Sequence, residues 1–214
     1  MVDLYCERLG PGLSAEPINA LTNVAFFIAA WAAWTLGKSR QRRPLSMTLL
    51  TGLVAVIGVG SVLFHTLATP WARVLDVAPI LLFQLGFLWL YLRVIITATA
   101  AVSALAVIGL LLAALLGRQV PALLNGSVTY LPAFLLLIGL GVYHQATHRR
   151  EPSALLLASG VFGVSLFFRA VDQAACPLVP FGTHFLWHLL NAVVLYLALR
   201  VLAVNWPRVL PTRA

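Results

Sequence analysis

Charged residues are scarce in this chain. Asp, Glu, Lys and Arg make up 9% of its 214 residues, and only six residues are acidic, whereas a soluble domain carries roughly 25% charged residues. The scarcity excludes a soluble globular protein, and the 61% hydrophobic content indicates an integral membrane protein. The net charge of +8 needs no nucleic-acid partner, because basic residues gather at membrane surfaces.

Long apolar runs fill most of the sequence. A transmembrane helix needs about 20 apolar residues, and seven runs qualify: 18–37, 45–66, 75–96, 99–117, 128–147, 153–173 and 182–204. They predict an all-α membrane protein, a seven-transmembrane helix bundle. The predicted parts are an acidic metal-binding segment at 1–17, the bundle at 18–205 and a short tail at 206–214. The polar first seventeen residues lead us to expect no cleavable signal peptide.

The basic residues predict the orientation. The side with the N-terminus would carry Arg8, Arg73 and Arg118. The opposite side would carry the larger set, with Arg169 left uncounted inside a span: Lys38, Arg40, Arg42, Arg43, Arg93, Arg149, Arg150, Arg200, Arg208 and Arg213. The positive-inside rule therefore places the N-terminus outside and the C-terminus in the cytoplasm.

Titratable residues gather at the outer ends of the predicted helices. Ionisable residues inside a membrane are costly and are functional candidates by default. Ser61 and His65 share one face of the second span, at positions i and i+4. The others are Asp76 at the start of the third span, Asp172 at the close of the sixth, and His184 and His188 in the first turns of the seventh.

The HxxxH pair of His184 and His188 is typical of a metal site, because two imidazoles one turn apart can bind one ion. His65 would complete the three protein ligands of a catalytic zinc, which keeps a fourth position for water. Asp76 would orient or deprotonate that water or hold a histidine, and Ser61 would stabilise an oxyanion. The alternative is that these histidines only pack or hydrogen-bond between helices.

A second pair, His144 and His148, lies at the cytoplasmic end of the fifth span, beside Arg149 and Arg150. No carboxylate or third histidine joins it at that depth. We interpret these two histidines as interfacial residues.

The N-terminal segment is acidic and rich in turns. It holds Asp3, Glu7 and Glu16, with glycine turns between them and Asn19 after them. Carboxylates, amide oxygens and backbone carbonyls are the ligands that calcium prefers. The segment therefore predicts a calcium site, although a solvated loop with a cap on the first helix fits the same spacing.

Four short stretches together resemble the alkaline ceramidase family. They are YCE followed by EPINALTN, then GSVLFH, LDVAP and HFLWHLLNA, in family order along the whole chain. That family lies within a wider superfamily of seven-helix membrane hydrolases that includes the adiponectin-receptor-like proteins. The compact loops and short tails look bacterial.

The resemblance implies a zinc site made by His65, His184 and His188, with Ser61 and Asp76 assisting the chemistry. It also implies a calcium site, with Asn19 in its surroundings or in the link toward the zinc. The calcium ligands would be Asp3, Glu7, Glu16 and the backbone near Tyr5 and Leu9.

Cys6 and Cys176 are the only two cysteines. On the predicted topology both lie outside, where a disulfide can persist, and the resemblance suggests the same pairing. The alternative is two unpaired thiols.

Together these features predict a zinc-dependent membrane amidohydrolase of sphingolipid or related lipid metabolism. It would cleave ceramide or a similar N-acyl lipid to a fatty acid and a long-chain base, in a bacterial inner membrane with the site toward the periplasm. The alternatives are a seven-helix receptor-like or sensory protein with a structural zinc, and a transporter or proton channel. The sequence leaves the oligomeric state open.

Overall fold

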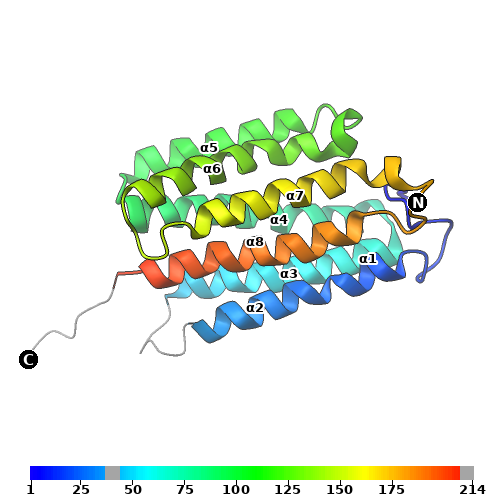
Figure 1. Ribbon diagram of the computed structural model, residues 1–214, viewed down its shortest axis with the longest axis horizontal. Coiled ribbons are helices and arrows are strands. Elements are labelled where there is room, and N and C mark those ends of the chain that lie inside the picture. The colour runs from blue at the N-terminus through cyan, green and yellow to red at the C-terminus, as the bar shows by residue number, and fades with distance from the viewer. Residues whose placement is uncertain (37–43, 208–214) are drawn as a thin grey trace, which may run out of the picture.

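The computed structural model describes residues 1–36 and 44–207, and within them the chain forms helices and no strand (Figure 1). Seven helices are long and apolar enough to cross a membrane, which confirms the predicted fold: Pro17–Leu36, Leu45–Leu67, Pro70–Ile96, Ala100–Gly117, Leu123–Ala146, Ala154–Ala175 and His184–Asn205. The predicted tail at 206–214 lies almost wholly outside the described residues.

The first span is divided in two. Helix α1 (Pro17–Thr22) passes into α2 (Val24–Leu36) at Asn23. The Asn23 side-chain amide donates to the Asn19 carbonyl, at 2.7 Å, so polar groups cover the backbone at this junction. Helix α1 lies at one end of the bundle, between the N-terminal segment and α2 (Figure 1).

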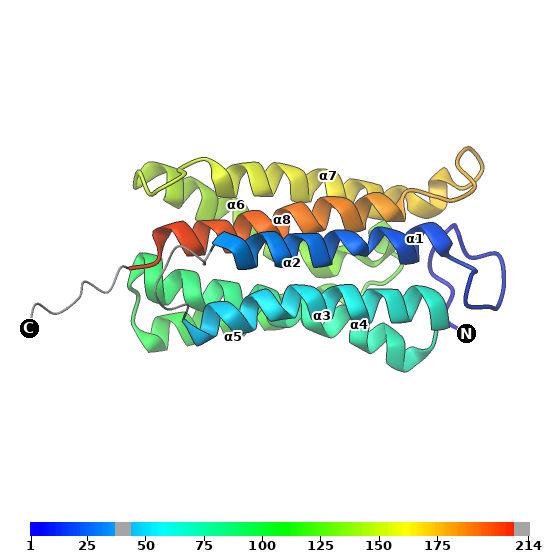
Figure 2. The same ribbon diagram turned by 90° about the horizontal axis from the view of Figure 1, so that it is seen from below.

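The other spans run side by side along the bundle (Figures 1 and 2). Helix α3 (Leu45–Leu67) packs on α4 (Pro70–Leu90), and α7 (Ala154–Ala175) packs on α8 (His184–Asn205). Helix α2 contacts both α3 and α8, while α5 (Ala100–Gly117) and α6 (Leu131–Ala146) lie on the opposite side. The N-terminus and the last turn of α8 lie at opposite ends of the bundle, and the N-terminal segment covers the end where α3 finishes and α8 begins.

Helix α4 begins at Pro70, five residues before the predicted start at 75. Thr69 is its N-cap, and its hydroxyl accepts a hydrogen bond from the Ala72 N–H at 3.3 Å. Proline fits the first turn of a helix because its missing N–H would have no partner there. With this cap the helix includes residues 70–74, which the predicted apolar run left out. Asp76 therefore lies inside α4, not at its start.

Two short irregular helices complete the chain. A π-helical turn, η1 (Tyr91–Ile96), continues α4, and a 3-10 segment, η2 (Leu123–Tyr130), precedes α6. Within η2, Leu124, Asn125 and Gly126 have positive φ, so the chain reverses there before it enters α6.

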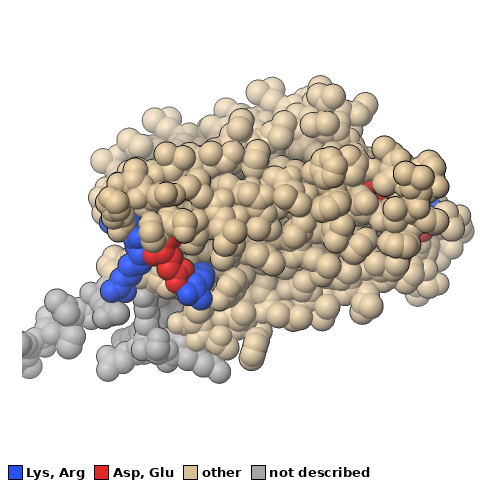
Figure 3. All heavy atoms as spheres, viewed as in Figure 1, with Lys and Arg blue, Asp and Glu red and all other residues tan. Residues whose placement is uncertain are grey.

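The space-filling view is consistent with a membrane belt. On the face shown, charged side chains lie near the two ends, and the middle of the bundle shows none (Figure 3). A partly exposed ion pair, Arg200 and Glu151 at 2.5 Å, lies near the end of the bundle where α8 finishes. Several of the basic residues that predict orientation lie outside the described residues, namely Lys38, Arg40, Arg42, Arg43, Arg208 and Arg213, and the orientation stays a prediction.

Gly60 allows α3 and α4 to approach closely. A Cβ atom at Gly60 would lie 2.0 Å from the Leu75 carbonyl oxygen, so Gly60→Ala should push α4 away and lower stability by roughly 1–3 kcal/mol. Thermal unfolding in detergent measures the effect. Gly52→Ala is the matched control on the same helix, because its Cβ would meet nothing within 4 Å. Equal melting temperatures for the two variants would contradict the close contact.

Candidate metal centre

Three buried histidines meet at the end of the bundle covered by the N-terminal segment. His65 comes from the last turn of α3, and His184 and His188 come from the first turns of α8. Each offers a ring nitrogen, and these atoms all lie within 4.8 Å of one another. The structure thus brings together the three residues that the sequence predicts as metal ligands.

The Nδ1 atoms of His65 and His188 have hydrogen-bond partners in the protein. His65 Nδ1 lies 2.5 Å from Glu16 Oε2, and His188 Nδ1 lies 3.0 Å from the Thr22 hydroxyl. Thr22 donates its own hydrogen to the Ile18 carbonyl, at 2.9 Å, so it accepts one from His188. A carboxylate or hydroxyl acceptor fixes the proton on Nδ1 and leaves Nε2 bare.

The two bare nitrogens face each other. His65 Nε2 and His188 Nε2 are 3.1 Å apart, so two lone pairs would repel unless a cation lies against them. His184 adds a buried Nδ1 that has no hydrogen-bond partner among the described residues. Buried polar atoms rarely stay unpaired, and three imidazole acceptors are a donor set that suits zinc. The residues present therefore fit a metal ion.

Tyr5 covers His184. The two rings stack with centroids 3.5 Å apart and planes 17° apart. Burial raises the pKa of the Tyr5 phenol above its ordinary value, although the charge of Arg169 opposes this. The phenol is therefore neutral at physiological pH and seals this side of the site as an aromatic lid.

Ser61 and Asp76 lie beside the histidines. Ser61 is buried one turn before His65 on α3. The Asp76 carboxyl on α4 interacts with both the Ser61 hydroxyl and His65. Neither residue belongs to the three-histidine group. The arrangement places a hydroxyl donor and a carboxyl group next to the candidate ligands without adding to the ligand set.

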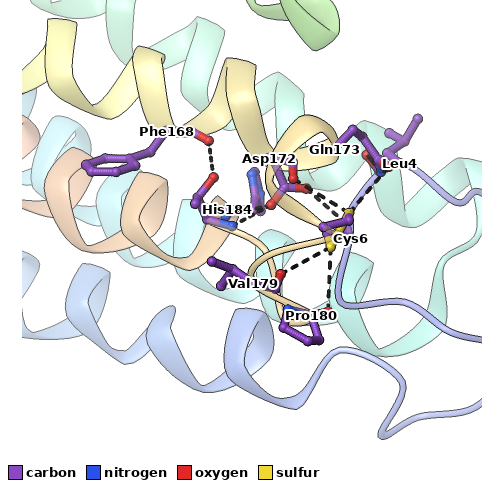
Figure 4. The surroundings of a disulfide bond; sticks show 10 residues. Leu4, Cys6, Phe168, Asp172, Gln173, Val179, Pro180 and His184 are labelled. Atoms are coloured by element: carbon purple, nitrogen blue, oxygen red, sulfur yellow. Dashed lines mark hydrogen bonds between the residues drawn. A yellow bond between two sulfur atoms is a disulfide. The ribbon is translucent and has the colours of Figure 1, made fainter.

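Asp172, at the end of α7, joins three segments over the site (Figure 4). Its Oδ1 accepts the backbone N–H groups of Thr183 and His184, at 2.7 and 2.9 Å, and its Oδ2 accepts the N–H of Cys6, at 2.9 Å. A carboxylate at a helix N-terminus satisfies free N–H groups and favours the helix dipole. Asp172 therefore fixes the start of α8, and with it His184.

The predicted disulfide is present. Cys6 and Cys176 are bonded, and the bond ties the N-terminal segment to the loop that follows α7 (Figure 4). Gly182 lies in the same cluster with φ +65, and a Cβ there would come within 2.2 Å of Asp172 Oδ1. The segment, the loop and the start of α8 are thus held as one unit.

The structure does not gather the predicted calcium ligands into one set. Asp3 is exposed and Leu9 is 92% exposed. The Glu7 carboxylate instead accepts the N–H groups of Ile18 and Asn19, at 2.6 and 2.8 Å, and so caps α1. Among the described residues, the three-histidine cluster is the group found with suitable metal-ligand spacing.

Glu16 is likewise bound by protein donors. One carboxylate oxygen faces Arg8 Nε at 2.5 Å, and the other faces His65 Nδ1 and the Asn19 side-chain amide at 2.5 and 3.1 Å. Burial by itself would raise the pKa of Glu16, but the hydrogen bonds from His65 and Arg8, together with the charge of Arg8, outweigh it and lower the pKa. Glu16 is therefore ionised.

Arg169 is a buried cation close to the site. Its guanidinium donates to the Asn125 carbonyl and the Ser127 hydroxyl, at 2.7 and 2.8 Å. It also lies over the rings of Tyr130 and Trp187, at 5.2 and 5.5 Å from their centroids. Arg169 thus pins the positive-φ stretch of η2 against α7 and α8.

An apolar cavity lies between the helices, and Phe26, whose ring contacts that of His188, is one of its lining residues. Trp187 and Asn191 on α8, next to His188, line it together with Phe83 and Phe87 on α4 and Leu137 on α6. Almost all of its wall is hydrocarbon or aromatic. It can therefore accept an aliphatic chain.

The other histidine pair lies at the opposite end of the bundle. His144 Nδ1 is 2.8 Å from the Tyr91 hydroxyl, and its Nε2 is 3.1 Å from the Arg150 carbonyl oxygen. His148 is exposed. Both ring nitrogens of His144 therefore have protein partners, unlike those of His184.

Comparison with known families decides the relationship. The family model described as Ceramidase matches residues 11–209. The chain belongs to the Ceramidase family. No curated protein matches it. Membership confirms the resemblance seen in the sequence, and it makes this membrane protein a ceramidase-type hydrolase with a possible metal site at its three histidines.

Sequence reasoning missed two partners of this ceramidase site. They are Thr22, which contacts His188, and Arg8, which contacts Glu16 and entered only the prediction of orientation. Thr22 follows Asn19 within one helical turn and could have been placed beside it. Arg8 carried a signal as well, because it is a basic residue inside an acidic segment.

Proposed function

We propose that this ceramidase-family protein is a zinc-dependent amidohydrolase. It cleaves the N-acyl amide bond of ceramide or a similar N-acyl lipid and releases a fatty acid and a long-chain base. The observation that carries the proposal is the three-histidine cluster, with two bare Nε2 atoms 3.1 Å apart and an unpartnered Nδ1; Phe26, which contacts His188, also lines an apolar cavity.

His65, His184 and His188 would hold the metal. When bound, zinc would polarise the amide carbonyl and lower the pKa of a water molecule. Glu16 and Thr22 keep the Nε2 atoms of His65 and His188 free and aimed at the same point. Such outer partners typically change metal affinity by about 10–100-fold.

Ser61 and Asp76 would handle the charge and the proton of the reaction. Ser61 would donate a hydrogen bond to the carbonyl oxygen as negative charge develops there. Asp76 would take the proton of the attacking water and pass it to the leaving amine nitrogen. The N–C bond then breaks, leaving a carboxylate and an amine.

The cavity suits the acyl part of the substrate. Its wall offers Gln84 and Asn191 as polar side chains among many apolar ones, and the Asn191 amide is already hydrogen-bonded to Ser165 and to the Trp187 carbonyl. A hydrocarbon chain is stabilised there by about 0.8 kcal/mol for each buried CH₂.

A receptor-like protein with a structural zinc fits less well. Structural zinc sites use four protein ligands. In the described residues the cluster offers three histidines, and both cysteines are bonded to each other. A zinc ion held by three histidines would keep a position for water, which a hydrolase needs.

We place the site on the outer, periplasmic side of a bacterial inner membrane. The excess of basic residues at the opposite end supports this orientation. The disulfide beside the site also supports it, because disulfides persist in oxidising compartments.

Metal analysis combined with a lipid screen tests the proposal. Protein purified in detergent should contain about one zinc per chain, and it should release fatty acid, read by mass spectrometry, from ceramides or from other N-acyl lipids. A zinc-loaded protein that releases none from the whole panel would contradict the proposed activity.

A further inference from the structure

Arg8 lies buried in the acidic N-terminal segment with its side chain 1% exposed. Its Nε faces Glu16 Oε1 at 2.5 Å, one terminal nitrogen donates to the His65 carbonyl at 2.7 Å, and the other reaches the Gly10 carbonyl at 3.4 Å. One cation thus contacts a carboxylate and two backbone carbonyls.

This contact set has the chemistry of a divalent-cation site. Calcium takes carboxylate and backbone carbonyl oxygens, and the sequence predicted calcium in this segment with Glu16 as a ligand. Arg8 occupies that role from within the chain. The fork of a guanidinium presents several fixed donors at once, which a lysine cannot do.

The remaining predicted ligands are committed elsewhere or face solvent. Both oxygens of Glu7 accept N–H groups of α1, and Asp3 is exposed. The second oxygen of Glu16 faces His65. The segment therefore does not fit calcium. The Arg8 guanidinium balances the negative charge of Glu16 instead.

We propose that the Arg8 guanidinium replaces calcium in this protein and acts as a positioning group for the metal centre. It fixes Glu16, Glu16 fixes the Nδ1 proton of His65, and His65 Nε2 then faces His188. The inference rests on the proposed function only in taking His65 as a metal ligand. The site is consequently independent of calcium.

Calcium titration of the wild-type protein is the first test. A site saturated at about 100 times Kd would raise the melting temperature by roughly 5–10 °C in a chain of this length. We expect the same melting temperature in the presence of a calcium-specific chelator and in millimolar calcium. A rise that disappears in Glu16→Gln would overturn the proposal.

Zinc affinity of Arg8 variants is the second test, measured by competition with a chromophoric chelator. Arg8→Ala should weaken zinc binding by about 10–100-fold, and added methylguanidinium should restore part of it. Arg118→Ala is the matched control, because that arginine is exposed and directly follows α5. Unchanged affinity in Arg8→Ala would overturn the proposal.

A double variant tests the route through Glu16. If Arg8 acts on His65 through Glu16, Arg8→Gln combined with Glu16→Gln should bind zinc no more weakly than Glu16→Gln alone. Additive losses would show that Arg8 does not act through Glu16. Should Arg8→Ala fail to fold, Arg8→Lys serves in its place, with a smaller expected loss that methylguanidinium does not restore.

These measurements read melting and zinc affinity, not lipid cleavage. If no lipid is cleaved but zinc affinity depends on Arg8, only the proposed activity is rejected. Cleavage together with calcium-dependent melting would reject the Arg8 proposal alone.

Discussion

A His188→Ala variant is expected to lose both its metal and its hydrolytic activity. Removing one imidazole from three leaves two ligands, and His188 is also the residue whose Nε2 lies against that of His65. Zinc content per chain should fall from about one to near zero, and fatty acid release should become undetectable. Elemental mass spectrometry and lipid mass spectrometry on the same sample measure the two quantities.

His148→Ala is the matched control for this experiment. It removes an imidazole that is exposed at the other end of the bundle, and it should change neither zinc content nor turnover. Full zinc occupancy in His188→Ala would contradict the assignment of His188 as a ligand, whatever the activity of the variant.

Ser61→Ala and Asp76→Asn are expected to slow turnover while zinc stays bound. Both side chains lie next to His65 but outside the three-histidine group. Losing an oxyanion donor typically costs 10²–10³ in rate, and we expect a loss on the order of 10² or more in each variant.

Single-turnover rates and zinc content should be measured together for these variants. Ser103→Ala controls for loss of a buried hydroxyl, because Ser103 on α5 donates to the carbonyl of Thr99, the N-cap of its own helix. Wild-type rates in both Ser61→Ala and Asp76→Asn would reduce these residues to packing roles.

The spans and the histidine cluster could be predicted because each follows from a periodic rule. A run of about 20 apolar residues has one stable solution in a bilayer. The i, i+4 spacing of His184 and His188 fixes their common face, and the matching depth of His65 follows from helix length. Such features need no knowledge of long-range contacts.

The hydrogen-bond partners of the histidines could not be predicted in this way. The same carboxylate, Glu16, suits an ion or an arginine, and the choice depends on how the loop from Arg8 to Glu16 folds back. Glu7 shows the same ambiguity, since its capping of α1 was the alternative to a calcium ligand. The early start of α4 depends on Thr69 as a cap, which the apolar pattern does not register.

The disulfide has a consequence for how the protein is made. Cys6 and Cys176 are separated by 170 residues, and His188 comes later still, so a ribosome must synthesise almost the entire chain before any of these partners can meet. A chain terminated before residue 184 would therefore lack two of the three candidate metal ligands, so the order of the helices delays assembly of the candidate metal centre until the last span is made.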